Sequence, residues 1–383
     1  MKYINMKANK LQQCEIRRMD DKAIGLENII NLGIGEPDMT TPKEICDAAY
    51  LGLREGHTHY TPNEGTLECR EAISNIHSIK NLNYNPKSEI CITTGGMGAL
   101  ALCLQVILDP GDEVLIQDPQ WSNYVPQVEY ADGIAVRVPT YGNENFVLKS
   151  TEIEKRISKK TKAIIINSPN NPTGLILSKE ELENIANLAK KYDLLVISDE
   201  VYNTITYGRD IFSIASIEGM RERTVIINSF SKSFAMTGWR IGYATGPKEI
   251  INKMAELQEN FNACPTSISQ YAAIYALTRL DLSEEMTKTY EKRRNIIVEG
   301  LEKIEGIKCI WPQGAFYVFP DISSFGLSSL EFCEKLLEEE RVICTPGSAF
   351  GKCGEGYIRI SYANSEKNLE KALERINNFT KKL

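Results

Sequence analysis

Short apolar runs alternate with stretches of helical periodicity between residues 89 and 228. The runs predict five strands: Glu89–Thr93, Glu113–Gln117, Ala163–Asn167, Leu194–Ser198 and Thr224–Asn228. A helix is predicted after the third run, because Ser178 and Glu181 have capping-box spacing and an apolar stripe follows at Leu182, Ile185, Leu188 and Ala189. Continuous β-branched runs separated by helices are typical of a parallel sheet covered on both faces. The fold class predicted is therefore α/β, with a mostly parallel central sheet.

The pattern changes after about Asn262. A long helical stretch through Arg293 precedes expected strands around Ala315–Phe319 and Tyr357–Ser361, and an amphipathic helix over Glu366–Phe379 ends the pattern. This alternation predicts a second, smaller α+β domain. We expect an N-terminal segment, 1–45, that packs with the small domain, a large ligand-binding domain, 46–270, and the small C-terminal domain, 271–383.

Charge and composition narrow the functional classes. The formal charge is −7, from 44 basic and 51 acidic residues, which offers no basic footprint for nucleic acid. No apolar run approaches the roughly 18 residues of a membrane span, and the N-terminus is charged throughout. The ten cysteines are scattered, and the three histidines (His57, His59 and His77) cluster in one short region. This usage favours reduced thiols in a cytoplasmic protein over a zinc site, and it gives little support to Ser-His-Asp chemistry.

A glycine turn follows the first predicted strand. Thr94–Ala101 reads TGGMGALA, so bare backbone amides meet the positive end of a helix, which is an anion site. The stretch also matches G-x-G-x-x-A, and Asp118 lies 20 residues past Gly98, as in a dinucleotide-binding fingerprint. On this motif alone, a dinucleotide, another phosphate ligand and a plain tight turn all remain open.

Other polar groups follow the later strands. Asp199 ends one strand and, taken alone, is typical of a helix N-cap. The Ser168–Gly174 stretch has the composition of a turn, and Lys232 lies between two phenylalanines, with Arg240 eight residues further on. The carboxyl ends of parallel strands share one edge of the sheet, so these groups and the glycine turn are expected in one site. A nicotinamide has no use for this lysine and aspartate, whereas pyridoxal 5'-phosphate uses both.

At this point the chain resembles the class I (fold-type I) pyridoxal-phosphate aminotransferases, and is similar to bacterial aspartate aminotransferases. The resemblance rests on SPNNPTG, SDEVY, SFSKSFAMTGWRIGYATGP, YTPNEG and YIRISYA, and extends from about Gly33 to the C-terminus. It implies a pyridoxal-phosphate enzyme that moves an amino group between an L-amino acid and a 2-oxo acid by a ping-pong mechanism.

The resemblance also implies roles for individual residues. Lys232 would bond to the cofactor aldehyde and act as general base, Asp199 would pair with the pyridinium nitrogen, and Asn171 and Tyr202 would bind the ring oxygen. The remaining cofactor contacts would come from the amides of Gly96 and Met97, from Ser229 and Arg240 on the phosphate, from Trp121 stacked on the ring, and from Tyr60 on the phosphate of a neighbouring subunit. A homodimer with shared sites is thereby implied.

For the substrate, the resemblance assigns the α-carboxylate to Arg359, because a guanidinium forms a two-point fork that lysine cannot reproduce. The plainer interpretation is an exposed charge on an edge strand. Gly35, Trp121 and Asn171 would line the same pocket. Some relatives carry a lysine at the place of Met97 to bind an acidic side chain, so neutral or apolar amino acids are the expected substrates.

Three alternatives stay open from the sequence. A C–S β-lyase could use the same scaffold, because fold does not separate α-carbon chemistries. A nicotinamide-dependent dehydrogenase fits only the Gly96–Asp118 pattern. A regulatory binding module would need an added DNA-binding segment, for which the enzyme fold leaves no room.

Overall fold

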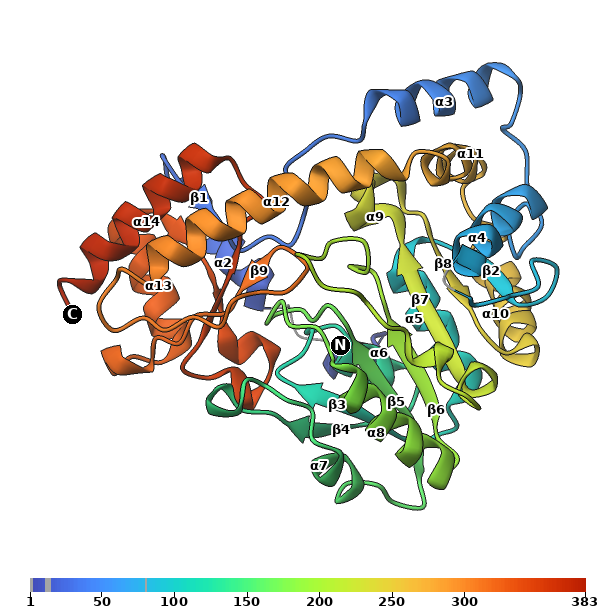
Figure 1. Ribbon diagram of the computed structural model, residues 1–383, viewed down its shortest axis with the longest axis horizontal. Helices are drawn as coiled ribbons and strands as arrows, with labels where there is room; N and C mark the ends of the chain where they lie inside the picture. Colours follow the sequence, from blue (N-terminus) through green and yellow to red (C-terminus); the bar gives the residue numbers. More distant parts are fainter. Residues whose placement is uncertain (1–2, 11–14, 80) are drawn as a thin grey trace.

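A seven-stranded sheet forms the centre of the computed structural model, which describes residues 3–10, 15–79 and 81–383 (Figure 1). In spatial order its strands are β2 (Ile90–Thr93), β8 (Gly242–Thr245), β7 (Thr224–Ser229), β6 (Leu195–Asp199), β5 (Thr161–Asn167), β3 (Glu113–Asp118) and β4 (Ile134–Pro139). Only β8 runs antiparallel to its neighbours. The predicted mostly parallel sheet is confirmed, and the five strands expected from apolar runs are β2, β3, β5, β6 and β7.

Helices cover both faces of this sheet, as predicted. The flanking helices are α3 (Lys43–Arg54), α4 (Leu67–Ile79), α5 (Gly95–Ile107), α6 (Tyr124–Tyr130), α7 (Ser150–Glu154), α8 (Lys179–Lys191), α10 (Lys248–Asn262) and α11 (Ser267–Leu277). Successive residues of β5 point to opposite faces, so Ala163 and Ile165 pack with α5, α6 and α10, whereas Ile164 and Ile166 pack with α7 and α8. The predicted capping box of Ser178 and Glu181 opens α8.

The C-terminal part is built around a three-stranded antiparallel sheet in the order β11 (Thr345–Pro346), β12 (Ile358–Ser361), β9 (Tyr317–Val318). Its helices are α12 (Leu280–Leu301), α13 (Ser329–Glu340) and α14 (Glu366–Thr380). The N-terminal helices α1 (Met6–Lys10) and α2 (Glu15–Lys22) precede β1 (Ile30–Asn31), which pairs in parallel with β10 (Val342–Ile343). The long helical stretch expected after Asn262 is interrupted at Thr278 and Arg279, between α11 and α12.

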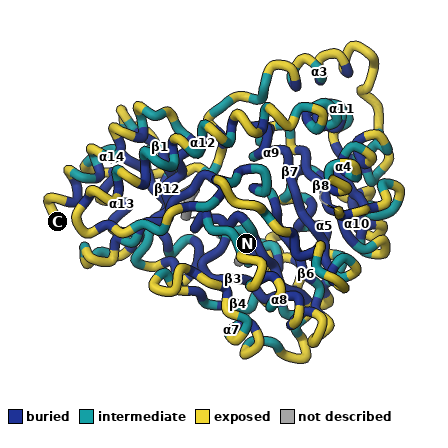
Figure 2. The backbone as a smooth tube through the Cα atoms, in the orientation of Figure 1, coloured by how far each residue is buried: buried dark blue, intermediate teal, exposed yellow. Residues whose placement is uncertain are grey.

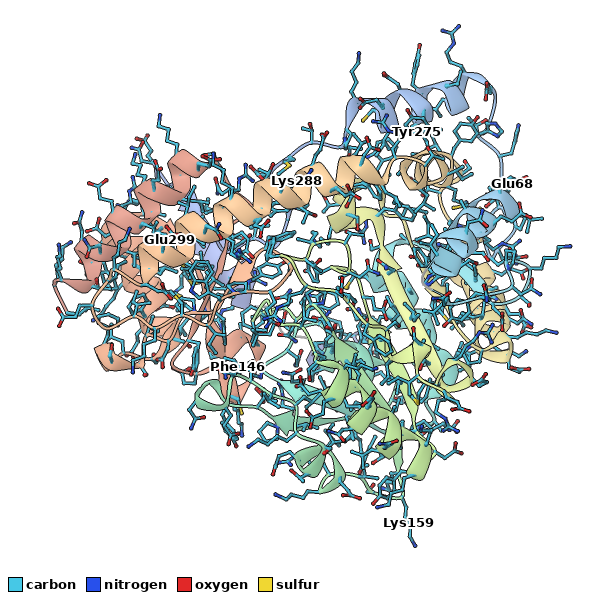
Figure 3. The ribbon with its side chains drawn as sticks, viewed as in Figure 1. Glu68, Phe146, Lys159, Tyr275, Lys288 and Glu299 are labelled. Atoms are coloured by element: carbon cyan, nitrogen blue, oxygen red, sulfur yellow. The ribbon has the colours of Figure 1, made fainter. Side chains whose placement is uncertain are left out.

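Helix α12 extends from the central sheet to the C-terminal part, with Lys288 and Glu299 along its length (Figures 1 and 3). Away from α12, Phe146, which follows β4 and is labelled in Figure 3, also links the two parts. Its ring packs against those of Phe319 and Tyr357. Burial is concentrated in the strands, whereas α3 is largely exposed (Figure 2). None of the helices in the described part of the chain combines the length and apolar character needed to cross a bilayer.

Candidate active site

The carboxyl ends of β2, β5, β6 and β7 meet at one edge of the central sheet and open onto a cavity of about 420 Å³. This is the edge at which open α/β sheets bind ligands. The resemblance assigned cofactor or substrate roles to twelve residues, and eleven of them line this cavity: Gly35, Gly96, Met97, Trp121, Asn171, Asp199, Tyr202, Ser229, Lys232, Arg240 and Arg359. The exception is Tyr60, which is 88% exposed. Motifs spread over more than 300 positions therefore converge on one pocket.

Lys232 lies on the short helix α9 (Phe230–Ser233), directly after β7. Its Nζ points into the cavity and donates a hydrogen bond to the carbonyl oxygen of Gly35 at 2.7 Å. Removal from water lowers the pKa of Lys232 to about 8, and the nearby cations Arg359 and Arg240 act in the same direction. An amine with this pKa is partly neutral near pH 8 and can act as a nucleophile or a base.

Asp199 is the last residue of β6 and is almost fully buried. Its Oδ2 accepts a hydrogen bond from the hydroxyl of Tyr124 at 2.6 Å, and its Oδ1 accepts one from the backbone amide of Val201 at 3.2 Å. Burial raises the pKa of Asp199 to about 6, against the two hydrogen bonds, which lower it. The hydrogen bond to Val201 is a local contact of the kind that a simple helix N-cap would make. The side chain of Asp199 also lines the cavity, which an N-cap role does not explain.

An anion cradle occupies one end of the cavity. Helix α5 begins at Gly95, so Gly96 and Met97 present the free amides of its first turn. The hydroxyls of Ser229 and Ser231 and the side chain of Arg240 lie beside them.

This cradle depends on the absence of side chains. A Cβ on Gly95, whose φ is +72°, would lie 2.7 Å from the Arg240 guanidinium. A Cβ on Gly242 would lie 2.6 Å from the carbonyl carbon of Gly95 and 2.7 Å from the amide nitrogen of Gly96. The backbones of β8 and the glycine turn are therefore in direct contact, which sets the position of the free amides.

The dinucleotide fingerprint does not form. It requires that the strand before the glycine turn lie near the strand that ends in the acidic residue, but β2 is at one edge of the sheet and β3 is next to the other edge. Asp118 instead accepts hydrogen bonds from the amides of Lys352 and Cys353, at 3.2 and 3.1 Å. The spacing in the sequence is coincidental.

Arg359 lies on β12, the middle strand of its sheet, and is 2% exposed, so the interpretation as an exposed edge charge is wrong. Its Nη1 donates to Oδ1 of Asn171 at 3.0 Å, and its Nη2 donates to the carbonyl oxygen of Gly33. The guanidinium lies between the rings of Tyr317 and Phe350, with its carbon 4.6 and 4.9 Å from the ring centroids. A buried cation held in this way faces the cavity as a fixed anion-binding group.

Two tyrosines of the pocket were not found from the sequence. Tyr124 follows the carboxyl end of β3, and that position after a predicted strand was the available signal. Tyr317 is on β9, and its hydroxyl lies 2.9 Å from that of Tyr202. A Cβ on Gly35 would lie 2.4 Å from the Tyr317 hydroxyl, so glycine is needed there for the ring to reach the pocket. No local sequence pattern predicts the contact between Tyr317 and Tyr202.

The side chain of Met97 lines the cavity beside the cradle and is 39% exposed. Its sulfur accepts hydrogen bonds from the side-chain amides of Asn123 and Gln127, at 3.5 and 3.3 Å. The cationic side chains that line this cavity are Lys232, Arg240 and Arg359.

Comparison with known proteins gives a consistent picture. Residues 27–376 match the family model described as aminotransferase class I and II. The chain is 46% identical to aromatic-amino-acid aminotransferase 2 of Thermococcus litoralis, covering 96% of this chain and 95% of that one, and 47% identical to an aspartate aminotransferase of Pyrococcus abyssi, covering 94% of each. The crystal structure of an aromatic aminotransferase from Pyrococcus horikoshii superposes with a TM-score of 0.91, at 45% identity over 95% of this chain and 99% of that one.

Proposed function

We infer the roles of the pocket residues from one premise: this chain belongs to the aminotransferase class I and II family and is a pyridoxal 5'-phosphate-dependent aminotransferase. Its substrates are an amino acid and a 2-oxo acid. The observation that carries the assignment of roles is the presence of Lys232 and Asp199 in one cavity that also contains an anion cradle.

The donor set of the cavity fits this cofactor. We propose that Lys232 holds it covalently through its aldehyde, and that Asp199 carries the charge opposite the ring nitrogen. Asn171 and Tyr202 would donate to the ring oxygen. The phosphate would be held by the amides of Gly96 and Met97, the hydroxyl of Ser229 and the guanidinium of Arg240, and the ring would be covered by Trp121. When bound, pyridoxal phosphate supplies an electron sink for the electron pair left on the substrate α-carbon.

The remaining chemistry falls to side chains of this chain. Arg359, fixed by Asn171 and Gly33, would bind the substrate α-carboxylate and so orient the α-carbon toward Lys232. Displaced from the cofactor by the substrate amino group, the Lys232 amine, whose pKa is lowered to about 8 by burial, would be free to remove the α-proton. It would deliver that proton to the cofactor carbon that carries the amino group after the half-reaction, and water would release the first 2-oxo acid. A second oxo acid would reverse these proton transfers, which completes a ping-pong cycle.

The substitution of Lys232 by alanine tests this assignment. Lys232→Ala should still bind pyridoxal phosphate through the cradle, but without the absorbance band that borohydride abolishes, and it should lose nearly all turnover. Lys159→Ala is the matched control, because Lys159 is exposed at the lower edge of the molecule (Figure 3). Full activity of the Lys232 variant would refute the proposal. Pyruvate and ammonia released from cysteine without an oxo acid would instead indicate β-lyase chemistry.

We further propose that the preferred amino acids have neutral or apolar side chains. The relatives at similar identity are named for aromatic amino acids and for aspartate, so overall identity does not decide the substrate. The cavity supports the proposal: Met97 is apolar, and we assign Arg240 and Arg359 to the phosphate and the α-carboxylate. A panel of amino acids ranked by kcat/KM tests it, and aspartate at the top of the ranking would contradict it.

A homodimer with shared active sites is part of the same proposal. Tyr60 is exposed and lies outside the cavity of its own chain, and exposed apolar side chains gather on α3, namely Tyr50, Leu51 and Leu53. Sedimentation should therefore give twice the chain mass, and Tyr60→Phe should weaken cofactor binding, whereas Tyr3→Phe should not. A monomer with full activity would refute this proposal of a dimer.

We also propose that the enzyme is cytoplasmic. The described cysteines are free thiols, which supports this location.

A further inference from the structure

Tyr124 occupies a position that the roles above do not explain. It opens α6, is 1% exposed, and belongs to the apolar cluster formed by β3, β5, α5 and α10. Its ring and that of Trp121 form a T-shaped contact, with centroids 5.3 Å apart and an interplanar angle of 88°. Its hydroxyl nevertheless points into the active-site cavity and donates to Oδ2 of Asp199 at 2.6 Å.

This short hydrogen bond has only one direction. Burial and the adjacent Asp199 charge both raise the pKa of Tyr124 well above its usual value, so the phenol keeps its proton and remains the donor. A hydrogen bond to an ionised carboxylate is stronger than one between neutral groups. Burial favours the neutral acid form of Asp199 and raises its pKa, whereas the hydrogen bond from Tyr124 stabilises the charged form and lowers that pKa.

The same contact fixes the orientation of the carboxylate. Oδ1 of Asp199 is held by the amide of Val201 and Oδ2 by the Tyr124 hydroxyl, so rotation of the carboxylate would break both bonds. The ring of Tyr124 cannot follow such a rotation, because it is packed between Trp121 and the apolar cluster.

We propose that Tyr124 is a positioning residue for the aminotransferase reaction, which holds the Asp199 carboxylate ionised and oriented toward the ring nitrogen of the cofactor. It would act through Asp199 and not on the substrate, and the inference rests on the role proposed above for Asp199. Without the hydroxyl, Asp199 would be a stronger base, and the proton shared with the ring nitrogen would move toward the carboxylate.

The test is Tyr124→Phe, which removes one oxygen atom and keeps the packed ring. The readouts are the ¹⁵N chemical shift of the ring nitrogen in holoenzyme loaded with ¹⁵N-labelled pyridoxal phosphate, the dissociation constant of the cofactor, and kcat and KM of the first half-reaction. Tyr130→Phe is the control, because Tyr130 ends the same helix with an exposed side chain. Asp199→Asn and the double variant show whether the effect passes through Asp199.

We expect Tyr124→Phe to move the ¹⁵N shift toward that of an unprotonated pyridine. We also expect kcat to fall about tenfold with KM nearly unchanged, as for loss of one hydrogen bond to a charged group, and cofactor binding to weaken several-fold. In the Asp199→Asn background the same substitution should change neither the shift nor the affinity.

An unchanged ¹⁵N shift with kcat within twofold of the unaltered enzyme would overturn the inference, and so would equal effects in both backgrounds. If Asp199→Asn itself left the shift and the activity unchanged, the proposed role of Asp199 would fail instead.

Discussion

Arg359→Lys perturbs the substrate end of the pocket while keeping its charge. The guanidinium bonds Asn171 and Gly33 at the same time, and one ammonium cannot replace both bonds and also offer a fork to a carboxylate. Loss of one charge-assisted bond to the substrate costs about 1.5–3 kcal/mol, so kcat/KM of the first half-reaction should fall by about 10- to 150-fold. A buried acceptor left without its donor costs about 1–3 kcal/mol, so the melting temperature should also fall by a few degrees.

The assay is single-turnover conversion of a neutral amino acid, followed by the cofactor absorbance. Arg209→Lys is the control, because Arg209 is exposed and does not line the pocket. A substrate amine without an α-carboxylate shows whether the loss is specific to the carboxylate contact of Arg359. Because such an amine cannot use that contact, both variants should convert it at the same slow rate, whereas a generally damaged active site would convert it more slowly. If Arg359→Lys kept kcat/KM for the amino acid within threefold of the unaltered enzyme, the clamp would have to lie elsewhere.

Four further outcomes are expected. Met97→Lys should raise the ratio of kcat/KM for aspartate to that for leucine at least tenfold, through one charge-assisted bond, and an unchanged ratio would remove Met97 from substrate selection. Because burial lowers the pKa of Lys232 to about 8 and only the neutral amine attacks an aldehyde, the rate of pyridoxal-phosphate incorporation into apo-protein should rise with pH and level off above about 8. Glu36→Gln should move that midpoint to lower pH, since the Glu36 charge raises this pKa, and a shift to higher pH would contradict the stated cause. Ser178→Ala should cost about 1 kcal/mol of stability through the lost cap of α8, measured by denaturant unfolding, and leave kcat/KM unchanged.

The strands that were predictable from sequence are those buried on both faces, because their apolar runs are continuous. Two strands of the central sheet lacked that signal. Strand β4 is an edge strand that carries Arg137 and is largely half-buried, and β8 is a four-residue strand that begins with Gly242. The break between α11 and α12 was also missed, since Thr278 and Arg279 are acceptable helix residues and tertiary packing decides the interruption.

The residues of the site also fall into those that the sequence predicts and those that it does not. Groups that follow parallel strands, such as Asp199 and Lys232, could be brought together from topology alone, because those strands end at one edge. Tyr317 reaches Tyr202 across 115 positions from a different sheet, and only the packing of the two parts shows that contact. Tyr60 is exposed and does not line the pocket, so the cofactor contact that we propose for it would need a second copy of the chain.

The cavity is formed partly by main-chain contacts and partly by side chains. The anion cradle is set by main chain against main chain at Gly242, where a Cβ would lie 2.6 Å from the carbonyl carbon of Gly95 and 2.7 Å from the amide nitrogen of Gly96. The lining also includes apolar side chains, among them Ile34 and Met97, and Met97 lies beside the cradle. A substitution at Met97 or Ile34 leaves those main-chain contacts in place, so we expect it to change the amino acid preference and to keep the proposed phosphate contacts. This expectation agrees with relatives of near-equal identity that are named for different amino acids.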